Sequence, residues 1–239
     1  MHTPPPTDHF IADELSLLGR LVPLDGQAII ELGCGKAELA RRLVAAHPGS
    51  QVLGLEVDER QLAKNLAQQA GTWQGIRFER AGAEQIPAPD ASFDLALMLK
   101  SLHHVPLDRL NQALGEVWRV LRPGGCLYVS EPVYDGALNH VMLPFNDEGS
   151  VRRAAYLALL RALRSGAWEQ VTERYFETAV RYASFAEFEQ RMIHVTFAER
   201  RVDAAMLAEV RARFELHAAP DGSAAFTRPM RINLLRKRG

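Results

Sequence analysis

The sequence predicts an α/β fold in which a mainly parallel, doubly wound sheet carries helices on both faces. Between residues 27 and 132, short apolar stretches alternate with amphipathic stretches, and the connecting loops are short. This order is typical of right-handed βαβ crossovers, which build a parallel sheet. The apolar stretches show little polar alternation, as expected of strands that are buried on both faces.

Length, composition and charge limit the class of protein. The 239 residues are enough for one α/β domain with an insertion, and the net charge of -1 argues against a nucleic-acid partner. Cys34 and Cys126 form no disulfide or metal-binding pattern. The N-terminus does not resemble a signal peptide, and no apolar run approaches the roughly 18 residues of a membrane span. We expect a cytoplasmic protein with no metal site and no stable membrane association; its oligomeric state is left open.

The elements of the first half follow from apolar spacing and turn residues. Asp58 is a plausible N-cap, and the "RPGG" stretch predicts a turn because Pro123 presets φ and Gly124 accepts a positive φ. The predicted elements are an N-terminal helix over 8–22, strands over 28–32, 51–57, 76–83, 93–102 and 126–132, and helices over 37–46, 58–71 and 109–120.

The pattern changes after the strand over 126–132. Residues 134–190 are rich in aromatic residues and predict helices without an intervening strand, which suggests a lid inserted over the sheet. Residues 191–239 predict the return of the sheet, with strands over 191–197 and 228–237 around a helix over 203–217. We expect residues 1–239 to form a single domain that contains this lid.

A glycine-rich turn follows the first predicted strand. A dinucleotide-binding turn requires G-x-G-x-x-G, but counting from Gly33 the third glycine is replaced by Glu38. A bulky anion beside a pyrophosphate has the wrong size and sign, which argues against an NAD-dependent oxidoreductase. An acid-x-Gly-x-Gly-x-Gly pattern fits better, because Glu31 and Gly35 match it and Ala37 stands in the last place.

This turn resembles motif I of the class I S-adenosylmethionine-dependent methyltransferases. The stretches "AGAEQIP", "SFDLALMLKSLHHV" and "LGEVWRVLRPGGCLYVSEP" follow in the order and spacing of that family, over roughly residues 27 to 132. The resemblance implies a Rossmann-like, seven-stranded sheet with an antiparallel last strand. It also implies S-adenosylmethionine as cofactor and methyl transfer to a small-molecule substrate under a closing lid. The alternative is a cofactor-binding sensor or partner subunit without catalysis.

The resemblance also implies which residues hold the cofactor. Glu56, at the end of the second strand, corresponds to the acid that accepts hydrogen bonds from the ribose hydroxyls. Many relatives carry an Asp-Ala pair for the adenine, where this chain has Gly82 and Ala83. The Ala83 backbone can still donate, and Glu84 or Gln85 could replace the missing carboxylate. The expected cofactor-binding residues are Glu31, Gly33, Cys34, Gly35, Glu56, Val57, Ala83, Glu84 and Leu99.

Methyl transfer from a sulfonium requires an in-line geometry more than covalent help from the enzyme. A general base is needed only if the acceptor arrives protonated. His103 and His104 follow the fourth strand at the carboxyl edge of the sheet, where ligands bind in such folds, and histidine titrates near neutrality. We expect His104, or else His103, to act as the base or to contact the substrate.

Further residues at the same edge are candidates for substrate binding. Glu131 ends the fifth strand, and Tyr134 follows it closely. Because the family's last strand runs antiparallel, Arg228 and Arg231 should lie at this edge and could bind a carboxylate through two hydrogen bonds. The sequence leaves the acceptor and the methylated atom open.

Overall fold

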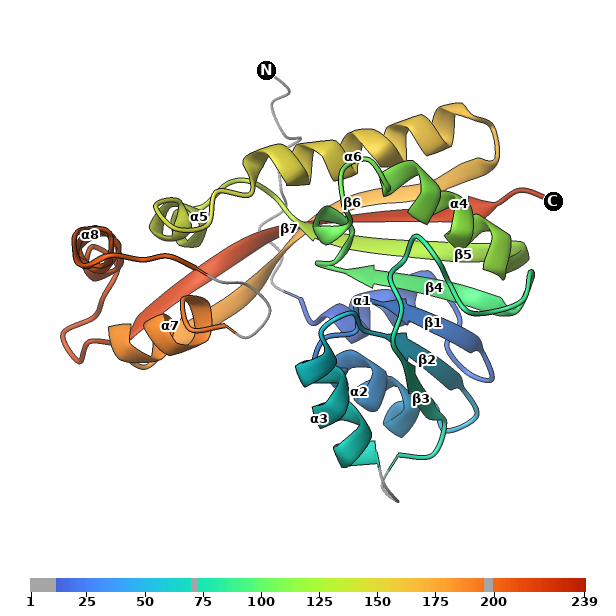
Figure 1. Ribbon diagram of the computed structural model, residues 1–239, viewed down its shortest axis with the longest axis horizontal. Helices are drawn as coiled ribbons and strands as arrows, with labels where there is room; N and C mark the ends of the chain where they lie inside the picture. Colours follow the sequence, from blue (N-terminus) through green and yellow to red (C-terminus); the bar gives the residue numbers. More distant parts are fainter. Residues whose placement is uncertain (1–11, 70–72, 196–199) are drawn as a thin grey trace. The chain divides into compact units, whose positions relative to one another are not determined.

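The computed structural model describes residues 12–69, 73–195 and 200–239 (Figure 1). The described chain forms two compact units, each built from separate segments. The sheet unit comprises Asp13–Glu131, Val151–Arg174 and Arg231–Gly239. The aromatic unit comprises Ala12, Pro132–Ser150 and Tyr175–Met230, and is named for its core. We describe each unit separately.

The seven strands form one sheet in the order β3-β2-β1-β4-β5-β7-β6, of which the sheet unit holds β1 to β4, β5 up to Glu131, β6 up to Arg174 and β7 from Arg231. Strands β1 to β5 pair in parallel, and β7 runs opposite to β5 (Figure 1). The strands are β1 Ala28–Leu32, β2 Gln51–Leu55, β3 Ile76–Glu79, β4 Phe93–Leu99, β5 Leu121–Pro132, β6 Trp168–Tyr182 and β7 Ala224–Lys237. The predicted Rossmann-like sheet with an antiparallel last strand is confirmed.

The predicted helices are present with shifted ends. The N-terminal helix begins after Asp13, whose carboxylate caps it by accepting from the Ser16 amide; most of the predicted segment before it lies outside the described residues. Asp58 accepts from the Arg60 amide in front of α3, as its predicted cap role requires. The helices are α1 Glu14–Leu21, α2 Glu38–Ala46, α3 Glu59–Gln69, η1 Leu102–His104 (a 3₁₀ turn), α4 Leu110–Val120, α5 Ala137–Met142, α6 Gly149–Arg164, α7 Phe185–Met192 and α8 Ala204–Glu215.

The core of the sheet unit joins the strands to the helices that cover them. Ile30 of β1, Leu114 of α4 and Leu159 of α6 are almost completely buried in one apolar cluster. Strand β5 begins at Leu121, before the predicted turn, but its pairing with β4 is interrupted at that turn. Leu121 pairs with Phe93, and the next residue of β5 that pairs with β4, Cys126, lies opposite Leu95. The sequence pattern therefore located both the strand and the interruption.

Two element predictions in the second half are wrong. Strand β6 occupies residues 168–182, inside the segment 134–190 that was predicted to contain only helices. Residues 191–195 form no strand: Arg191 and Met192 end α7, and the rest of the predicted strand reaches residues outside those described. The second error has a local cause, because a cap starts helix α7 shortly before the predicted strand. Ser184 accepts from the Glu187 amide, and the Glu187 carboxylate accepts from the Ala183 amide.

The aromatic unit has a core of its own. The ring of Phe188 lies 5.2 Å from Tyr182 and 5.3 Å from Phe214, measured between centroids. Leu138 and Val141 of α5 are buried in the same cluster. Among the described residues, no helix is long and apolar enough to cross a membrane. That the whole chain acts as one domain with a lid remains a prediction.

Candidate functional site

The glycine turn after β1 is held against the end of β2. The amides of Gly33 and Cys34 both donate to the carbonyl of Leu55, each at 2.9 Å. Gly33 has a φ of +70°, and a Cβ at this position would lie 2.8 Å from the Cβ of Ser101. Only glycine fits there. Burial raises the pKa of the Cys34 thiol, which makes this side chain an inert part of the turn's packing.

The alanine in the last place of the motif adopts a glycine-like conformation. Ala37 has φ 53° and ψ 33°, is fully buried, and immediately precedes α2. The left-handed region costs an L-residue roughly 1–2 kcal/mol relative to the right-handed one. Alanine in place of the motif's last glycine therefore fits in the available space, but its left-handed backbone conformation is strained.

Glu56 binds backbone amides with both carboxylate oxygens. Oε2 accepts from Gly35 at 2.8 Å, and Oε1 accepts from Val57 and Asp58 at 2.9 Å each. An ionised carboxylate has about four acceptor positions, so a further donor can still be bound. The apolar side chain of Val57 is 62% exposed next to this carboxylate. A fixed anion beside an exposed apolar side chain suits a nucleoside.

Glu31 carries a buried oxygen with no hydrogen-bond partner among the described residues. The residue is 3% exposed, and the orphan atom is Oε2. Burial raises the pKa of Glu31 to about 8; Lys100 opposes this rise and Glu56 adds to it. Lys100 follows the half-buried Leu99 at the end of β4 and has a left-handed backbone, with φ 56°. An unsatisfied buried acid beside the glycine turn fits a cationic group such as the ammonium of S-adenosylmethionine.

The loop expected to bind adenine places a carboxylate where the family has an aspartate. A Cβ built on Gly82 would overlap the carboxylate of Glu84. Glu84 therefore fills the space that a side chain at position 82 would take, while the neighbouring Ala83 is buried. The geometry favours Glu84 over Gln85 as the replacement for the missing aspartate.

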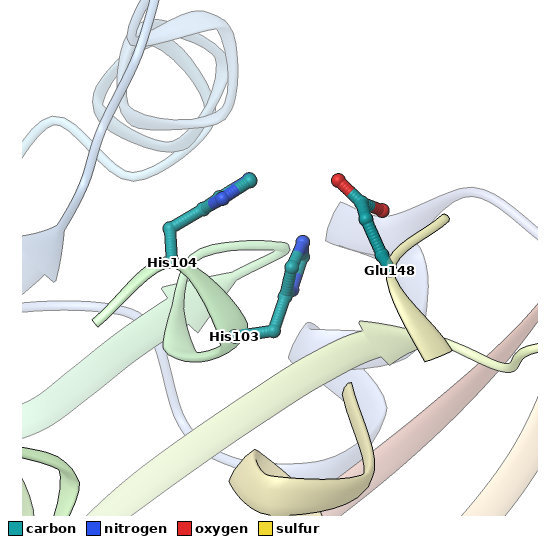
Figure 2. A group of neighbouring side chains, drawn as sticks. All are labelled: His103, His104 and Glu148. Carbon is teal, nitrogen blue, oxygen red and sulfur yellow. The ribbon is translucent and has the colours of Figure 1, made fainter. Parts of the chain in front are cut away.

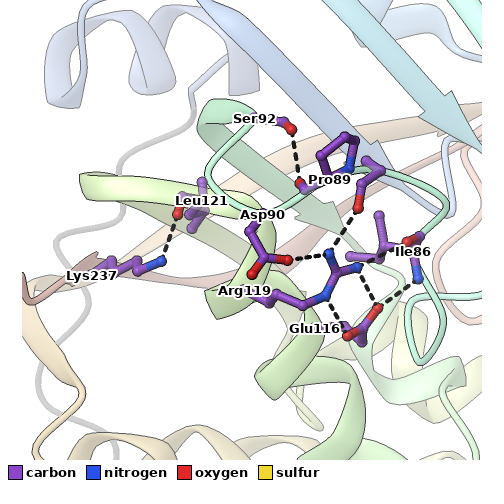
Figure 3. A network of polar contacts seen from close by, with 9 residues as sticks. Ile86, Pro89, Asp90, Ser92, Glu116, Arg119, Leu121 and Lys237 are labelled. Carbon is purple, nitrogen blue, oxygen red and sulfur yellow. Dashed lines mark hydrogen bonds and ion pairs between the residues drawn. The ribbon is translucent and has the colours of Figure 1, made fainter.

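Helix α4 fixes this loop from one side (Figure 3). The Arg119 guanidinium donates to the carbonyls of Ile86 at 3.0 Å and Ala88 at 2.8 Å, and forms ion pairs with Asp90 and Glu116. Glu116 in turn accepts from the Ile86 amide at 3.0 Å. One turn earlier on α4, a further side chain, Gln112, donates to the backbone of the same loop. The loop is therefore held by side chains rather than by a helix of its own.

His103 and His104 occupy η1, directly after β4, and both rings project from that turn (Figure 2). His103 is buried and its Nδ1 donates to the carboxylate of Glu131, which also accepts from the Leu102 amide at 2.9 Å. His104 is exposed, and its ring centroid lies 4.0 Å from that of His103. Because a carboxylate only accepts, this bond places a proton on Nδ1 of His103.

The remaining substrate candidates are distributed over both units. Tyr134 and Arg228 belong to the aromatic unit, where the Tyr134 hydroxyl donates to Asp147 at 2.8 Å. Arg231 belongs to the sheet unit, where its guanidinium stacks 3.7 Å from the Tyr156 ring centroid. Substrate roles for these residues stay predictions.

One residue of the site escaped the sequence analysis. Asn65 of α3 is fully buried, and its amide donates to the carbonyl of Gly35 at 2.7 Å. The available signal was a short polar side chain, a poor helix former, at a buried position of a predicted helix.

The fold and the site together resemble those of the class I methyltransferases. An acid, a glycine turn and a second acid lie at the carboxyl edge of a doubly wound sheet, where such folds bind ligands. Residues 30–129, less than half of the chain, match the methyltransferase domain family. The family prediction made from motif I is thereby confirmed.

Relatives and solved structures agree with this assignment. The 27-O-demethylrifamycin SV methyltransferase of Amycolatopsis mediterranei is 38% identical over 117 residues, which are 48% of this chain and 42% of that protein. The match thus spans less than half of that relative's length.

Two solved structures share the fold. A Bacillus halodurans protein described as a methyltransferase has a TM-score of 0.66 at 17% identity, covering 95% of this chain and 100% of the other. A SAM-dependent methyltransferase of Methanosarcina mazei has a TM-score of 0.57 at 14% identity, covering 96% and 99%. Nothing in these comparisons favours a non-catalytic binding protein or an NAD-dependent oxidoreductase.

Proposed function

We propose that the protein is an S-adenosylmethionine-dependent methyltransferase that acts on a small-molecule substrate. The observation that carries the proposal is the pair of buried acids around the glycine turn. Glu31 offers an unsatisfied oxygen to the ammonium of the cofactor, and the fixed carboxylate of Glu56 accepts from its ribose. We assign the binding of the adenine to the Glu84 side chain and the Ala83 backbone N–H.

When bound, S-adenosylmethionine supplies a methyl group that its sulfonium already activates for displacement. The chain's residues then have two tasks, which are to align the acceptor with the methyl group and to exclude water. We assign the alignment of the cofactor to the glycine turn and its two acids. For the acceptor, Tyr134, Arg228 and Arg231 stay the candidate contacts.

For a protonated acceptor, we assign the base to His103. The Glu131 carboxylate fixes its ring and keeps the proton on Nδ1, so that Nε2 can take the proton from an acceptor hydroxyl as the new bond to the methyl carbon forms. His104, which the sequence favoured, lacks this buried carboxylate and is proposed to contact the acceptor. A neutral charge balance and two free cysteines support a cytoplasmic protein without a nucleic-acid partner.

The cofactor assignment is tested by calorimetric titration of S-adenosylmethionine into the wild type and into Glu56→Gln, with NAD as a control ligand. Losing a hydrogen bond to a charged group costs about 1.5–3 kcal/mol, which corresponds to about 10- to 150-fold weaker binding. The matched control is Glu59→Gln, a neighbouring acid on α3 whose side chain is 67% exposed. Equal affinity in Glu56→Gln and wild type would remove the ribose assignment.

The catalytic assignment is tested with a panel of phenols, small acids and thiols as acceptors, followed by labelled-methyl transfer. For any phenol that is methylated, His103→Asn should lower kcat by about 10²- to 10⁴-fold, since this is the usual contribution of a positioned base. The acid limb of the pH–rate profile should disappear in the same variant. A profile that keeps this limb would move the base to another residue.

A further inference from the structure

We infer that Asn65 is a positioning residue for the cofactor, acting through the peptide groups of Gly35 on the carboxylate of Glu56. The inference rests on the proposed function, because it concerns the same cofactor site. It adds a residue that lies on α3, 30 positions beyond the glycine turn.

Gly35 is bonded at both of its backbone polar groups. Its N–H donates to Glu56 Oε2 at 2.8 Å, and its carbonyl accepts from Asn65 Nδ2 at 2.7 Å. The φ of Gly35 is +51°, so the turn depends on these bonds to select one conformation from those open to glycine. The same Asn65 nitrogen lies 3.9 Å from the sulfur of Cys34.

The orientation of the Asn65 amide is itself determined. Gln61, one helical turn earlier on α3, donates from Nε2 to Asn65 Oδ1 at 3.0 Å. This bond identifies Oδ1 as the acceptor side and directs Nδ2 toward Gly35. Asn65 is fully buried, so its side-chain amide needs a protein partner, and the Gly35 carbonyl is that partner.

These bonds form a chain from α3 to the proposed ribose site. Asn65 holds the carbonyl of Gly35, the Gly35 amide holds Oε2 of Glu56, and the other oxygen of Glu56 is held by the start of the α3 segment. Loss of the first bond frees the turn and lets the Glu56 carboxylate lose its orientation. The effect should therefore appear in cofactor binding and not in the step that deprotonates the acceptor.

The experiment compares Asn65→Asp, Asn65→Ala and Gln61→Ala with the control Gln69→Ala. Gln69 lies on the same helix and also donates its side-chain amide to a backbone carbonyl, that of Ile76, so its loss reports the cost of such a bond away from the turn. Affinity for S-adenosylmethionine is measured by calorimetry, folding by thermal melting, and the Gly35 amide by hydrogen exchange.

We expect the affinity for S-adenosylmethionine to fall about tenfold or more in both Asn65 variants, which corresponds to about 1.4 kcal/mol. Gln61→Ala, which leaves Asn65 in place, should show a smaller fall, and Gln69→Ala should bind like the wild type. Faster exchange of the Gly35 amide should accompany weaker binding. Where an acceptor is known, KM for the cofactor should rise while kcat stays within about twofold.

Three results would overturn the inference. The first is unchanged affinity in a folded Asn65 variant while the wild type binds. The second is a loss in Gln69→Ala as large as that in the Asn65 variants, which would reduce the effect to the stability of α3. If both Asn65 variants fail to fold, unchanged binding and unchanged Gly35 exchange in Gln61→Ala overturn it. If the wild type itself does not bind S-adenosylmethionine, the proposed function is wrong and the inference is lost with it.

Discussion

Replacing Glu31 with glutamine should make the protein more stable at neutral and alkaline pH. Burial raises the pKa of Glu31 from 4.5 to about 8. Between these values the folded state keeps a proton that the unfolded state has lost. Folding stability must therefore fall as the pH rises through this range, since the unfolded state binds fewer protons. Glutamine has nearly the same shape and cannot ionise, so Glu31→Gln removes this contribution.

The size of the stability change follows from the difference between the pKa values of Glu31 in the folded and the unfolded state. At about 1.4 kcal/mol per pH unit, the shift from 4.5 to about 8 corresponds to about 5 kcal/mol at its full extent. The difference in unfolding free energy between Glu31→Gln and the wild type should be small at pH 4.5. It should then grow with pH and level off above pH 8.

The assay is urea unfolding of both proteins in a series of buffers from pH 5 to pH 9. The control is Glu38→Gln, an exposed acid in the first turn of α2, for which surface substitutions predict changes within about 0.5 kcal/mol. Parallel pH curves for Glu31→Gln and the wild type would refute the reasoning. We also expect Glu31→Gln to bind S-adenosylmethionine more weakly, because glutamine cannot ionise when the ammonium approaches.

Three further predictions concern folding and the site. Ala37→Gly should raise stability by about 0.5–1 kcal/mol, since the left-handed strain exceeds the entropy cost of glycine; a lower melting temperature would contradict this. Arg119→Lys should lower the unfolding free energy in urea by about 1–3 kcal/mol, because the carbonyl of Ile86 loses the guanidinium N–H that donates to it; unchanged stability would mean that other contacts fix the loop expected to bind adenine. His103→Leu should cost about 3–5 kcal/mol by removing the ring that pairs with the buried Glu131 carboxylate, which then keeps the Leu102 amide; a melting curve like that of the wild type would count against the pairing.

The parts of the fold that follow from local signals were predictable from the sequence. The sequence signals for the glycine turn, the cap at Asp58 and the break before Cys126 each lie within a few neighbouring positions. Strand β6 was not predictable in this way. Its acids at Glu169, Glu173 and Glu177 recur every four residues, as on an exposed helix, although the strand lies at the edge of the sheet, where charges are tolerated.

The site was predictable only where its residues follow the motif. Glu31 and Glu56 come directly from the pattern of strand ends and turn. Which of the two histidines faces the buried carboxylate depends on the direction of a 3₁₀ turn, which the dipeptide does not encode. The sequence marks Asn65 only as a poor helix former; its partner could not be predicted, because it lies 30 residues away and the bond depends on tertiary packing.

The strand order of the sheet unit also has a consequence for biosynthesis. Strands β1 to β5 are translated first, but the neighbour of β5 in the sheet is β7, whose residues 231–237 leave the ribosome about a hundred residues later. Throughout that interval β5 presents an unpaired, apolar edge of the kind that promotes aggregation. The nascent chain should therefore depend on chaperones until β7 pairs with β5. Shortening β7 should lower the soluble yield, because the edge of β5 would then stay unpaired.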